Sequence, residues 1–463
     1  MEQNTPSVRL LDFIRSSPSC YHAIDNIRRK LIEKGYIELF EGEDWSVEVG
    51  GKYFVTRNSS SIIAFRIPER VVGGFMVVAS HSDSPTFRVK PNPELSGPEN
   101  YVRLNTERYG GMILDSWFDR PLSVAGRIMV RENGRIVEKL VSVDDDLLII
   151  PHVAIHMLKS NDGIVYNPAQ DLVPLFGLAG PDEKPQGSLM KIVAEAAGVD
   201  PDNILSHDLF LVNRQRQSVW GRSKEFISSP KLDDLQCAFS AFEAFTDSES
   251  DNLTNSGHSI PVMFVADNEE VGSATMQGAG STFLADTLLR VTSALEVCGA
   301  KCDCFGAYCT NSAGNSIAAY RRMLASSMLL SADNAHAVHP NHPELADPTH
   351  RPRLNGGVVI KYNAAQLYTT DSYSSAIFLE MCKKVGVPTQ MFCNRSDIRG
   401  GSTLGSISNT KVPLHAVDIG VAQLAMHSSY ETCGAFDTGY MINAMKEFFS
   451  SSLLVKNGSV EIV

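Results

Sequence analysis

Residues 260–273 read IPVMFVADNEEVGS, an apolar run that ends in a cluster of acidic side chains. Such a run, apolar at successive positions, is typical of a strand that is buried on both faces in a helix-covered sheet. Two adjacent carboxylates, Glu269 and Glu270, follow it almost directly. The stretch raises two questions: what kind of sheet contains the strand, and what stabilises two like charges at its end.

Helical and strand-like patterns alternate in the two outer parts of the chain. Residues 8–16 and 21–35 have helical periodicity, and residues 61–67 and 74–80 read as strands. From about residue 221 the same texture returns, with the helical stretches LLRVTSALEVC and SSAIFLEMCKKVG between the short apolar runs VMFVA, SMLLSA and PTQMFC. This alternation predicts an α/β fold, with helices on the faces of a central sheet.

The middle of the chain has a different pattern. Residues 125–143 (AGRIMVRENGRIVEKLVSV) alternate as strands around Asn133 and Gly134, a strong two-residue hairpin signal. A chain of 463 residues also exceeds what one hydrophobic core usually supports. We therefore expect a first part of the outer domain at residues 1–89, an inserted β-rich domain at 90–220, and the second part of the outer domain at 221–463.

Composition narrows the classes of partner. The chain has 41 Lys and Arg against 53 Asp and Glu, a formal net charge of -12, so nucleic acid and anionic membranes are poor candidate partners. We find neither a signal peptide nor an apolar run of membrane-spanning length. The nine cysteines are typical of reduced thiols in a cytoplasmic protein. The cysteine cluster at residues 298–309 does not have the usual zinc spacing, and we expect buried, unreactive thiols there.

Polar side chains gather where the predicted strands end. They belong to five stretches, VVASHSDSP, SPKLDDL, ADNEEVGS, LLSADNAHAVHPN and QLAMHSSYE, which contain His81, Asp83, Asp233, Asp234, Glu269, Glu270, Asp333, His336, His339 and His427. Ligands bind at the carboxyl ends of the strands in open α/β sheets, so these residues can converge although they are far apart in sequence. Each stretch alone is more often a capped turn or a solvated loop, but five of them in one chain favour a functional site.

So many converging carboxylates require a positive charge. Like charges within a few ångströms destabilise one another's ionised state unless a cation is present. Imidazole and carboxylate ligands without thiolate suit a catalytic zinc, or a manganese or cobalt site, better than a closed structural zinc site. We therefore expect two divalent metal ions per subunit, which answers the question raised by the adjacent glutamates.

Over essentially its whole length the sequence resembles the aspartyl aminopeptidases, a family of dinuclear-zinc metallopeptidases that includes the vacuolar aminopeptidase. The motifs that carry the resemblance are ASHSDSP, WFDRPLSVAGR, IPHVAIHM, SPKLDDL, DNEEVGS, SADNAHAVHPN, GGST and DIGVAQLAMHS. It implies hydrolysis of the first peptide bond of peptides, with a preference for amino-terminal Asp or Glu. It also implies an α/β/α zinc-peptidase sandwich interrupted by a β-rich dimerisation domain.

The resemblance also implies roles for single residues. Asp233 would bridge two metal ions, with His81 and Asp333 completing one position and Glu270 and His427 the other. Glu269 would be the general base that accepts a proton from a metal-activated water and delivers it to the leaving amine. Asp83 would belong to the catalytic machinery by orienting the imidazole of His81.

Further implied features concern substrate and assembly. Family members are dodecamers built from dimers, and the inserted domain carries residues to a neighbouring active site, a role for which His152 in IPHVAIHM is the candidate. Lys361, in the segment GGVVIKYNAAQLYTTD, is the candidate cation for an acidic side chain, and His336 is a further candidate for substrate binding.

The sequence departs from the family pattern in two places. Asp234 stands where Asn is more usual, and only a few polar residues precede the first helix, where vacuolar relatives carry a targeting extension. The second departure favours a cytoplasmic enzyme. Two alternatives stay open: another metal-dependent amidase or broad-specificity aminopeptidase of the same fold, and a catalytically silent cage protein, against which an intact Glu269 argues.

Overall fold

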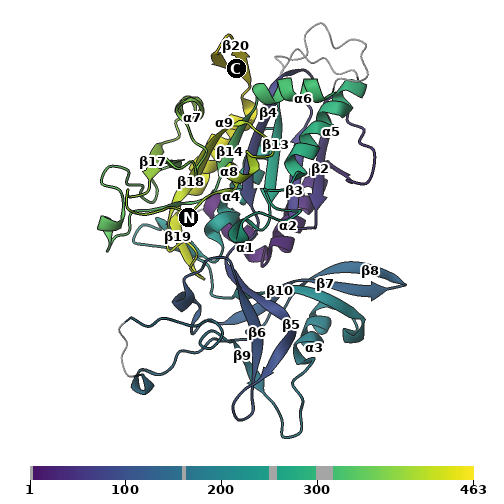
Figure 1. Cartoon of the computed structure of the whole chain (residues 1–463), viewed down its shortest axis with the longest axis vertical. Coiled ribbons are helices and arrows are strands. Elements are labelled where there is room, and N and C mark those ends of the chain that lie inside the picture. Colours follow the sequence, from purple (N-terminus) through teal and green to yellow (C-terminus); the bar gives the residue numbers. More distant parts are fainter. Residues whose placement is uncertain (1–3, 159–162, 250–257, 299–315) are drawn as a thin grey trace.

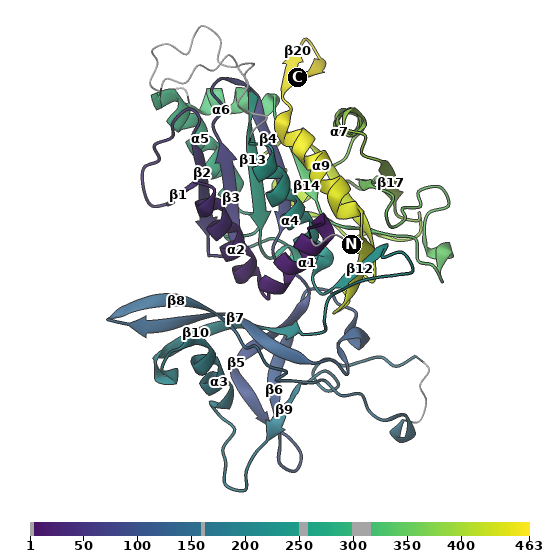
Figure 2. The same cartoon turned by 180° about the vertical axis from the view of Figure 1, so that it is seen from behind.

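The computed structural model describes residues 4–158, 163–249, 258–298 and 316–463. Within these ranges the chain forms one large sheet covered by helices and a second, smaller sheet at one end of the molecule (Figure 1). The view from behind shows that strands from the middle of the chain build the small sheet, while both outer parts contribute to the large one (Figure 2). The predicted α/β fold with a β-rich insertion is confirmed.

The large sheet has a parallel centre. Its order is β1-β2-β3-β13-β4-β14-β18-β19-β12-β11, with β15, β16 and β17 joined beside β18. The strands β13, β4, β14 and β18 are parallel neighbours, whereas β3 and β19 pair antiparallel at either side of them. The carboxyl ends of the four central strands therefore meet at one edge, as expected for a ligand site in such a sheet.

The strands of the large sheet have the following bounds: β1 (Ile37–Leu39), β2 (Lys52–Arg57), β3 (Ser61–Arg66), β4 (Val71–His81), β11 (Ser218–Trp220), β12 (Phe226–Ser229), β13 (His258–Ala266), β14 (Met328–Ala332), β15 (Ala335–His336), β16 (Val358–Tyr362), β17 (Thr389–Cys393), β18 (His415–Leu424) and β19 (Glu431–Gly434). A separate hairpin near the end of the chain consists of β20 (Leu453–Lys456) and β21 (Ser459–Ile462).

Helices cover both faces of this sheet. One face packs against α1 (Pro6–Ser16), α2 (Cys20–Glu33), α4 (Leu232–Asp247), α7 (Ser372–Lys384) and α9 (Asp437–Ser450), and the other against α5 (Phe283–Cys298), α6 (Ser316–Ala325) and α8 (Leu404–Ser408). Strand β4 shows why its sequence is apolar throughout: Met76 and Val78 belong to one core, and Phe75 and Val77 to the other. A strand buried on both sides has no polar face.

The small sheet forms the insertion. Its order is β8-β7-β10-β5-β6-β9, and its strands are β5 (Thr86–Ser96), β6 (Tyr101–Tyr109), β7 (Leu122–Glu132), β8 (Arg135–Ser142), β9 (Leu175–Leu178) and β10 (Ile204–Asn213). Helix α3 (Ser188–Ala197) packs into the same core. The predicted hairpin at Asn133 and Gly134 is confirmed, because both residues have positive φ and join β7 to β8.

The positions at which the chain passes from the large sheet to the small sheet and back lie close to the predicted domain boundaries. The small sheet contains residues 86–213, compared with the predicted 90–220, and β11 at residues 218–220 pairs within the large sheet. The division into domains and the dimerising role of the insertion stay predictions. The side chains of the cysteine cluster at residues 298–309 lie outside the described residues, as does most of that segment. None of the helices in the described ranges is long and apolar enough to cross a membrane.

Candidate metal centre

Four of the predicted site segments lie at the carboxyl ends of the four central parallel strands. His81 is the last residue of β4, Asp333 follows β14, Glu269 and Glu270 form a short 3-10 helix after β13, and His427 follows β18. The register aligns these ends: His81 pairs with Ala266 of β13. The predicted convergence of distant segments is thus a direct result of parallel pairing.

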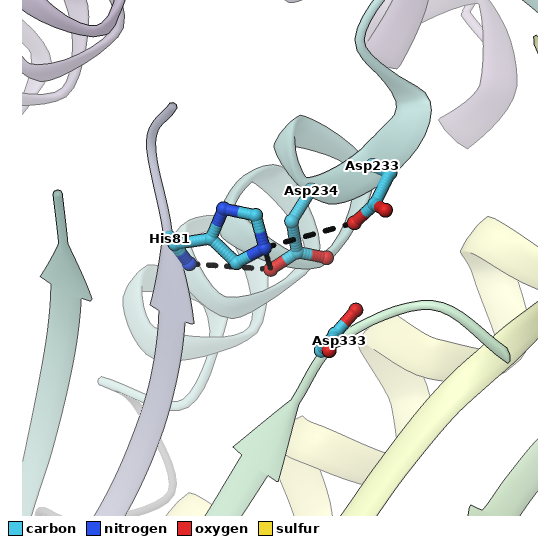
Figure 3. A group of neighbouring side chains, drawn as sticks. All are labelled: His81, Asp233, Asp234 and Asp333. Carbon is cyan, nitrogen blue, oxygen red and sulfur yellow. Dashed lines mark hydrogen bonds and ion pairs between the residues drawn. The ribbon is translucent and has the colours of Figure 1, made fainter. Parts of the chain in front are cut away.

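Asp233 and Asp234 approach the same edge from the first turn of α4. Both have non-helical backbone angles, the peptide bond between them is cis, and both side chains are buried. With His81 and Asp333 they form a group in which one ligand atom from each residue lies within 4.8 Å of the others. Figure 3 shows the His81 ring facing the two aspartates. Asp333 lies below the two aspartates in this view, at the end of a neighbouring strand.

A second group adjoins the first and shares Asp233. Its other members are Glu270 and His427, again with ligand atoms within 4.8 Å of one another. The Nε2 atom of His427 lies 3.3 Å from Asp233 Oδ2 and 3.5 Å from Glu270 Oε2. On the other side, the Nε2 atom of His81 lies 3.6 Å from Asp233 Oδ1. The Asp233 carboxylate therefore lies between two imidazoles, one at each of its oxygens.

The carboxylates of the centre are short of positive partners. Among the described residues, no donor makes a hydrogen bond to the buried oxygens Asp233 Oδ1 and Glu270 Oε1. Buried polar atoms in folded proteins are nearly always paired, and buried charges are paired or coordinate metals. The orphaned oxygens, the two imidazoles and the absence of thiolate from these groups fit divalent cations of the zinc, manganese or cobalt type.

Burial and crowding change the acidity of these groups. Burial, reinforced by the neighbouring carboxylates, raises the pKa of Glu269 to about 8. Burial and the Asp233 charge raise the pKa of Glu270 well above its ordinary value. Burial alone would lower the pKa of His81, but the carboxylates of Asp234 and Asp83 outweigh it and raise that pKa. Cations placed among these carboxylates would favour the ionised acids and the neutral imidazole.

Asp83 contacts both the imidazole of His81 and the turn that carries Glu269 and Glu270. Its backbone oxygen lies 3.1 Å from His81 Nδ1, and its carboxylate oxygen Oδ1 lies 3.4 Å from the same nitrogen. The two carboxylate oxygens also accept hydrogen bonds from the backbone N–H groups of Glu269 (3.1 Å) and Glu270 (3.2 Å). Asp83 therefore holds the turn that carries both glutamates as well as the ring that faces them.

Glu431 is a buried residue to which our sequence reasoning assigned no role. One of its carboxylate oxygens accepts the backbone N–H of Asp233 at 3.0 Å. The other accepts the N–H of His427 at 2.8 Å and the side-chain amide of Gln423 at 3.0 Å. Glu431 thus fixes the backbone of one member of each group. The signal in the sequence was an acidic residue four positions after His427, in the stretch HSSYE.

Lys361 lies beside the centre and is already engaged there. Its ammonium group is buried, donates to the backbone oxygen of Asp333 at 2.7 Å, and lies 3.4 Å from Asp333 Oδ2. It also lies over the ring of Tyr368, 5.2 Å from the ring centre. Burial acts to lower the pKa of Lys361, but the Asp333 charge outweighs this effect, so that the pKa is raised and the amine stays cationic. The residue combines support for Asp333 with a positive charge at the site.

One of the two histidines predicted to bind substrate, His336, lies within electrostatic range of Asp233 and His427. His152 belongs to the insertion, where its Nδ1 atom lies 2.6 Å from Asp119 Oδ2 and its ring stacks on Phe118 with 4.0 Å between ring centres. His336, in the short strand β15, packs edge-on against Phe392. Within the described part of the chain neither histidine belongs to a group that could hold a metal.

Comparison with known proteins agrees with the metal centre described above. The model of a family described as aminopeptidase I zinc metalloprotease (M18) matches residues 13–449. The chain belongs to the M18 family of zinc aminopeptidases. A probable M18 family aminopeptidase 2 of Clostridium acetobutylicum is 44% identical over 447 residues, which cover 96% of this chain and 98% of that protein. A protein of the same name from Pseudomonas paraeruginosa is 36% identical, with coverage of 96% and 98%.

Solved structures agree with the M18 assignment. A chain in the cryo-EM structure of the Ape4 and Nbr1 complex superposes with a TM-score of 0.88 at 36% identity, covering 96% of this chain and 85% of that one. A chain of the S. cerevisiae mApe1 dodecamer gives a TM-score of 0.80 at 26% identity, with 96% of each chain covered. The predicted aminopeptidase family and the metallopeptidase class are therefore confirmed.

Proposed function

We propose that this M18 protein removes amino-terminal Asp or Glu from peptides, using two divalent metal ions per subunit. Zinc is the first candidate, with manganese and cobalt as alternatives. The observation that carries the proposal is the position of the Asp233 carboxylate, with the Nε2 atoms of His81 and His427 at 3.6 and 3.3 Å from its two oxygens. A carboxylate placed in this way can bridge two cations, each of which also meets an imidazole.

The proposed ligand sets follow from the two groups. His81, Asp333 and one oxygen of Asp233 would hold the first ion, and Glu270, His427 and the other oxygen of Asp233 the second. Asp234 lies in the first group, but its Oδ2 atom accepts the backbone N–H of His81 at 3.2 Å. This hydrogen bond suits a residue that positions a ligand, so the bridging role goes to Asp233.

Glu269 is the proposed general base. Bound divalent ions would polarise the scissile carbonyl and acidify water. Glu269 would accept the proton of the attacking water and deliver it to the leaving amine, while Asp83 keeps the Glu269 backbone in place through the 3.1 Å hydrogen bond. Glu269 also forms a group with His81 and Glu270 in which the ligand atoms lie within 4.8 Å of one another. Both proposed ligand sets are complete without it, which leaves its carboxylate free to exchange protons.

Two observations support the substrate and assembly parts of the proposal. Lys361 places a buried cation beside the centre, as a pocket for an acidic side chain requires. The segment after His152 exposes Val153, Ile155 and Met157, which have relative exposures of 53, 60 and 78%. Exposed apolar clusters mark interaction surfaces. The yeast relative mApe1 is a dodecamer. We propose that this chain also forms a homo-dodecamer, in which a neighbouring subunit covers this apolar surface and His152 reaches the active site of a neighbouring subunit.

Free thiols support a cytoplasmic location for the proposed enzyme. The cysteines at positions 20, 237, 382, 393 and 433 are all unpaired, and the first three and the last are buried.

The proposed substrates are peptides, and His336 stays a candidate residue for substrate binding.

The deciding experiment is a metal-dependence assay. Protein stripped by a chelator and then supplemented with zinc, manganese or cobalt should regain hydrolysis of peptides with free amino-terminal Asp or Glu, and hydrolyse Leu and Ala peptides weakly. Hydrolysis of amino-terminally acylated peptides, with free peptides untouched, would indicate a deacylase of the same fold. Absence of hydrolysis from the metal-loaded protein would contradict the enzymatic proposal altogether.

A further inference from the structure

The insertion makes direct contact with the proposed metal centre through the end of strand β6. Tyr109, the last residue of β6, donates its hydroxyl hydrogen to Asp83 Oδ2 at 2.7 Å and accepts a hydrogen bond from the Asn268 side chain at 2.8 Å. The carboxylate of Asp83 in turn accepts the backbone N–H groups of Glu269 and Glu270. A short series of hydrogen bonds therefore joins the small sheet to the turn that carries Glu270.

The residues after Tyr109 lie against both members of the second group. Gly110 has φ +79°, and a Cβ atom there would lie 3.1 Å from Glu270 Cβ. A Cβ atom at Gly111 would lie 3.8 Å from His427 Nδ1. The N–H of Ile113 donates to the backbone oxygen of His427 at 3.0 Å. The small residues at 110 and 111 let the chain of the insertion pass close to Glu270 and His427.

The loop that carries His427 has further ties to the insertion. The N–H of Ser429 donates to Ser116 Oγ at 2.9 Å, and the Ser429 hydroxyl donates to the Ser116 backbone oxygen at 2.5 Å. The Asn213 side chain donates to the Ser429 backbone oxygen at 2.8 Å. His427 itself has φ +66°, a conformation that residues other than glycine adopt only when surrounding contacts enforce it. The contacts from the insertion supply part of that constraint.

The first group has a different kind of support. His81 ends a central strand, and its N–H donates to Asp234 Oδ2 at 3.2 Å. The N–H of Asp333 donates to the backbone oxygen of Ile419 in β18 at 3.0 Å, and Lys361 donates to the Asp333 oxygen at 2.7 Å. These partners all belong to the large sheet and its helices. Moving the insertion would leave these hydrogen bonds intact and would reach His81 only through Asp83, whose Oδ1 atom lies 3.4 Å from His81 Nδ1.

We propose that residues 109–113 couple the placement of the insertion chiefly to one metal position, that of Glu270 and His427, with Tyr109 as the positioning residue. The proposal rests on the proposed function, because it takes the two groups to be metal ligands. A cavity of about 440 Å³ lies between the insertion and the large-sheet unit, and its lining includes Tyr109, Asn213 and Ser429. The side chains therefore do not fill this interface, and the hydrogen bonds described above connect the two units across it. Assembly contacts on the insertion can thereby change the affinity of this metal position more than that of the other.

The test is a titration of metal-free protein with Zn²⁺ and Co²⁺, followed by calorimetry and by the Co²⁺ absorption spectrum. Wild type should bind two equivalents. Tyr109→Phe keeps the ring and removes the hydroxyl, so it should weaken one equivalent by at least about 10-fold, the lower range for residues that orient metal ligands. It should weaken the other equivalent less, because that position is reached only through the contact of Asp83 with His81. Ser116→Ala removes the hydrogen bond to the N–H of Ser429, two residues after His427, and should weaken the same equivalent.

Two further variants make the result decisive. His427→Ala identifies which equivalent belongs to the second position, and Tyr101→Phe, at a tyrosine with 45% exposure on the same strand, is the matched control that should bind as wild type does. If Tyr109→Phe and Ser116→Ala weaken both equivalents alike, neither, or the one that survives in His427→Ala, the coupling is refuted while the proposed function stands. A wild-type protein that binds no divalent ion would refute both.

Discussion

Replacement of Glu431 by Gln should weaken metal binding at both positions, because this one side chain holds the backbone of Asp233 and of His427. Its carboxylate accepts three N–H groups, at 2.8, 3.0 and 3.0 Å. Glutamine has the same shape, but one of its two polar atoms is a donor. The orientation that preserves most contacts directs the amide oxygen at His427 and Gln423, so the amide nitrogen faces the N–H of Asp233.

The magnitude follows from these three contacts. Burial and the Asp233 charge raise the pKa of Glu431 to about 8, and bound cations would keep it ionised. The hydrogen bond from Asp233 is then lost from a charged acceptor in a buried place, which costs about 1.5 to 3 kcal/mol. The two remaining bonds change from charged to neutral acceptors and become roughly half as strong, which adds about 1 kcal/mol. The total of about 3 kcal/mol corresponds to a decrease in metal affinity on the order of 100-fold, the upper range for residues that orient ligands.

The assay is competition for Zn²⁺ between the protein and a chromophoric chelator. Glu447→Gln is the matched control, because Glu447 is a glutamate with only 10% side-chain exposure that pairs with Lys384 on the far helices α7 and α9. Glu431→Gln should lower the affinity of both equivalents, in contrast to the selective loss expected for Tyr109→Phe. If Glu431→Gln binds two ions as tightly as the control does, the carboxylate does not position these ligands and the reasoning is wrong.

Three other outcomes are expected. Glu269→Gln should lower kcat by at least about 10²-fold with metal content unchanged, and near-normal turnover would exclude Glu269 as the general base. Lys361→Ala should lower kcat/KM for amino-terminal Asp and Glu by about 1.5 to 3 kcal/mol and spare Leu and Ala peptides; equal losses on all four would leave Lys361 as a support of Asp333 alone. Native mass measurement should find about twelve chains, and a stable, fully active monomer would contradict both the closed assembly and the role of His152.

The fold and the convergence of the site segments could be predicted because both depend on local pattern. Apolar runs such as residues 262–266 indicate buried strands, and parallel strands bring their carboxyl ends to one edge. The only local signal for Glu431 is its place four residues after His427, and Tyr109 has none; their partners Asp233 and Asp83 lie 198 and 26 positions away in the chain. The role of Tyr109 depends on how the small sheet sits against the large one, and that of Glu431 on how β19 and α4 meet in the large-sheet unit; periodicity contains neither arrangement.

Lys361 illustrates a different limit. Its position after an apolar run predicted a cation near the site, and the structure places a buried ammonium group there. The hydrogen bond from that group to the Asp333 backbone oxygen could not be anticipated, because backbone acceptors carry no residue signature. The proposed acidic preference therefore depends on how the lysine divides its charge between Asp333 and a substrate, which is the quantity that the Lys361→Ala comparison measures.

The strands that lead into and out of the insertion are antiparallel neighbours: Arg88 of β5 is paired with Phe210 of β10, and the Thr86 hydroxyl donates to the Leu211 backbone oxygen at 2.8 Å. Antiparallel neighbours can be closed by a two-residue turn. The segment between them can therefore lengthen, shorten or be exchanged over evolutionary time without a break in the hydrolase sheet. In protein engineering the same junction would accept a foreign oligomerisation module, provided that the replacement restores a donor for Asp83 and a brace for the His427 loop.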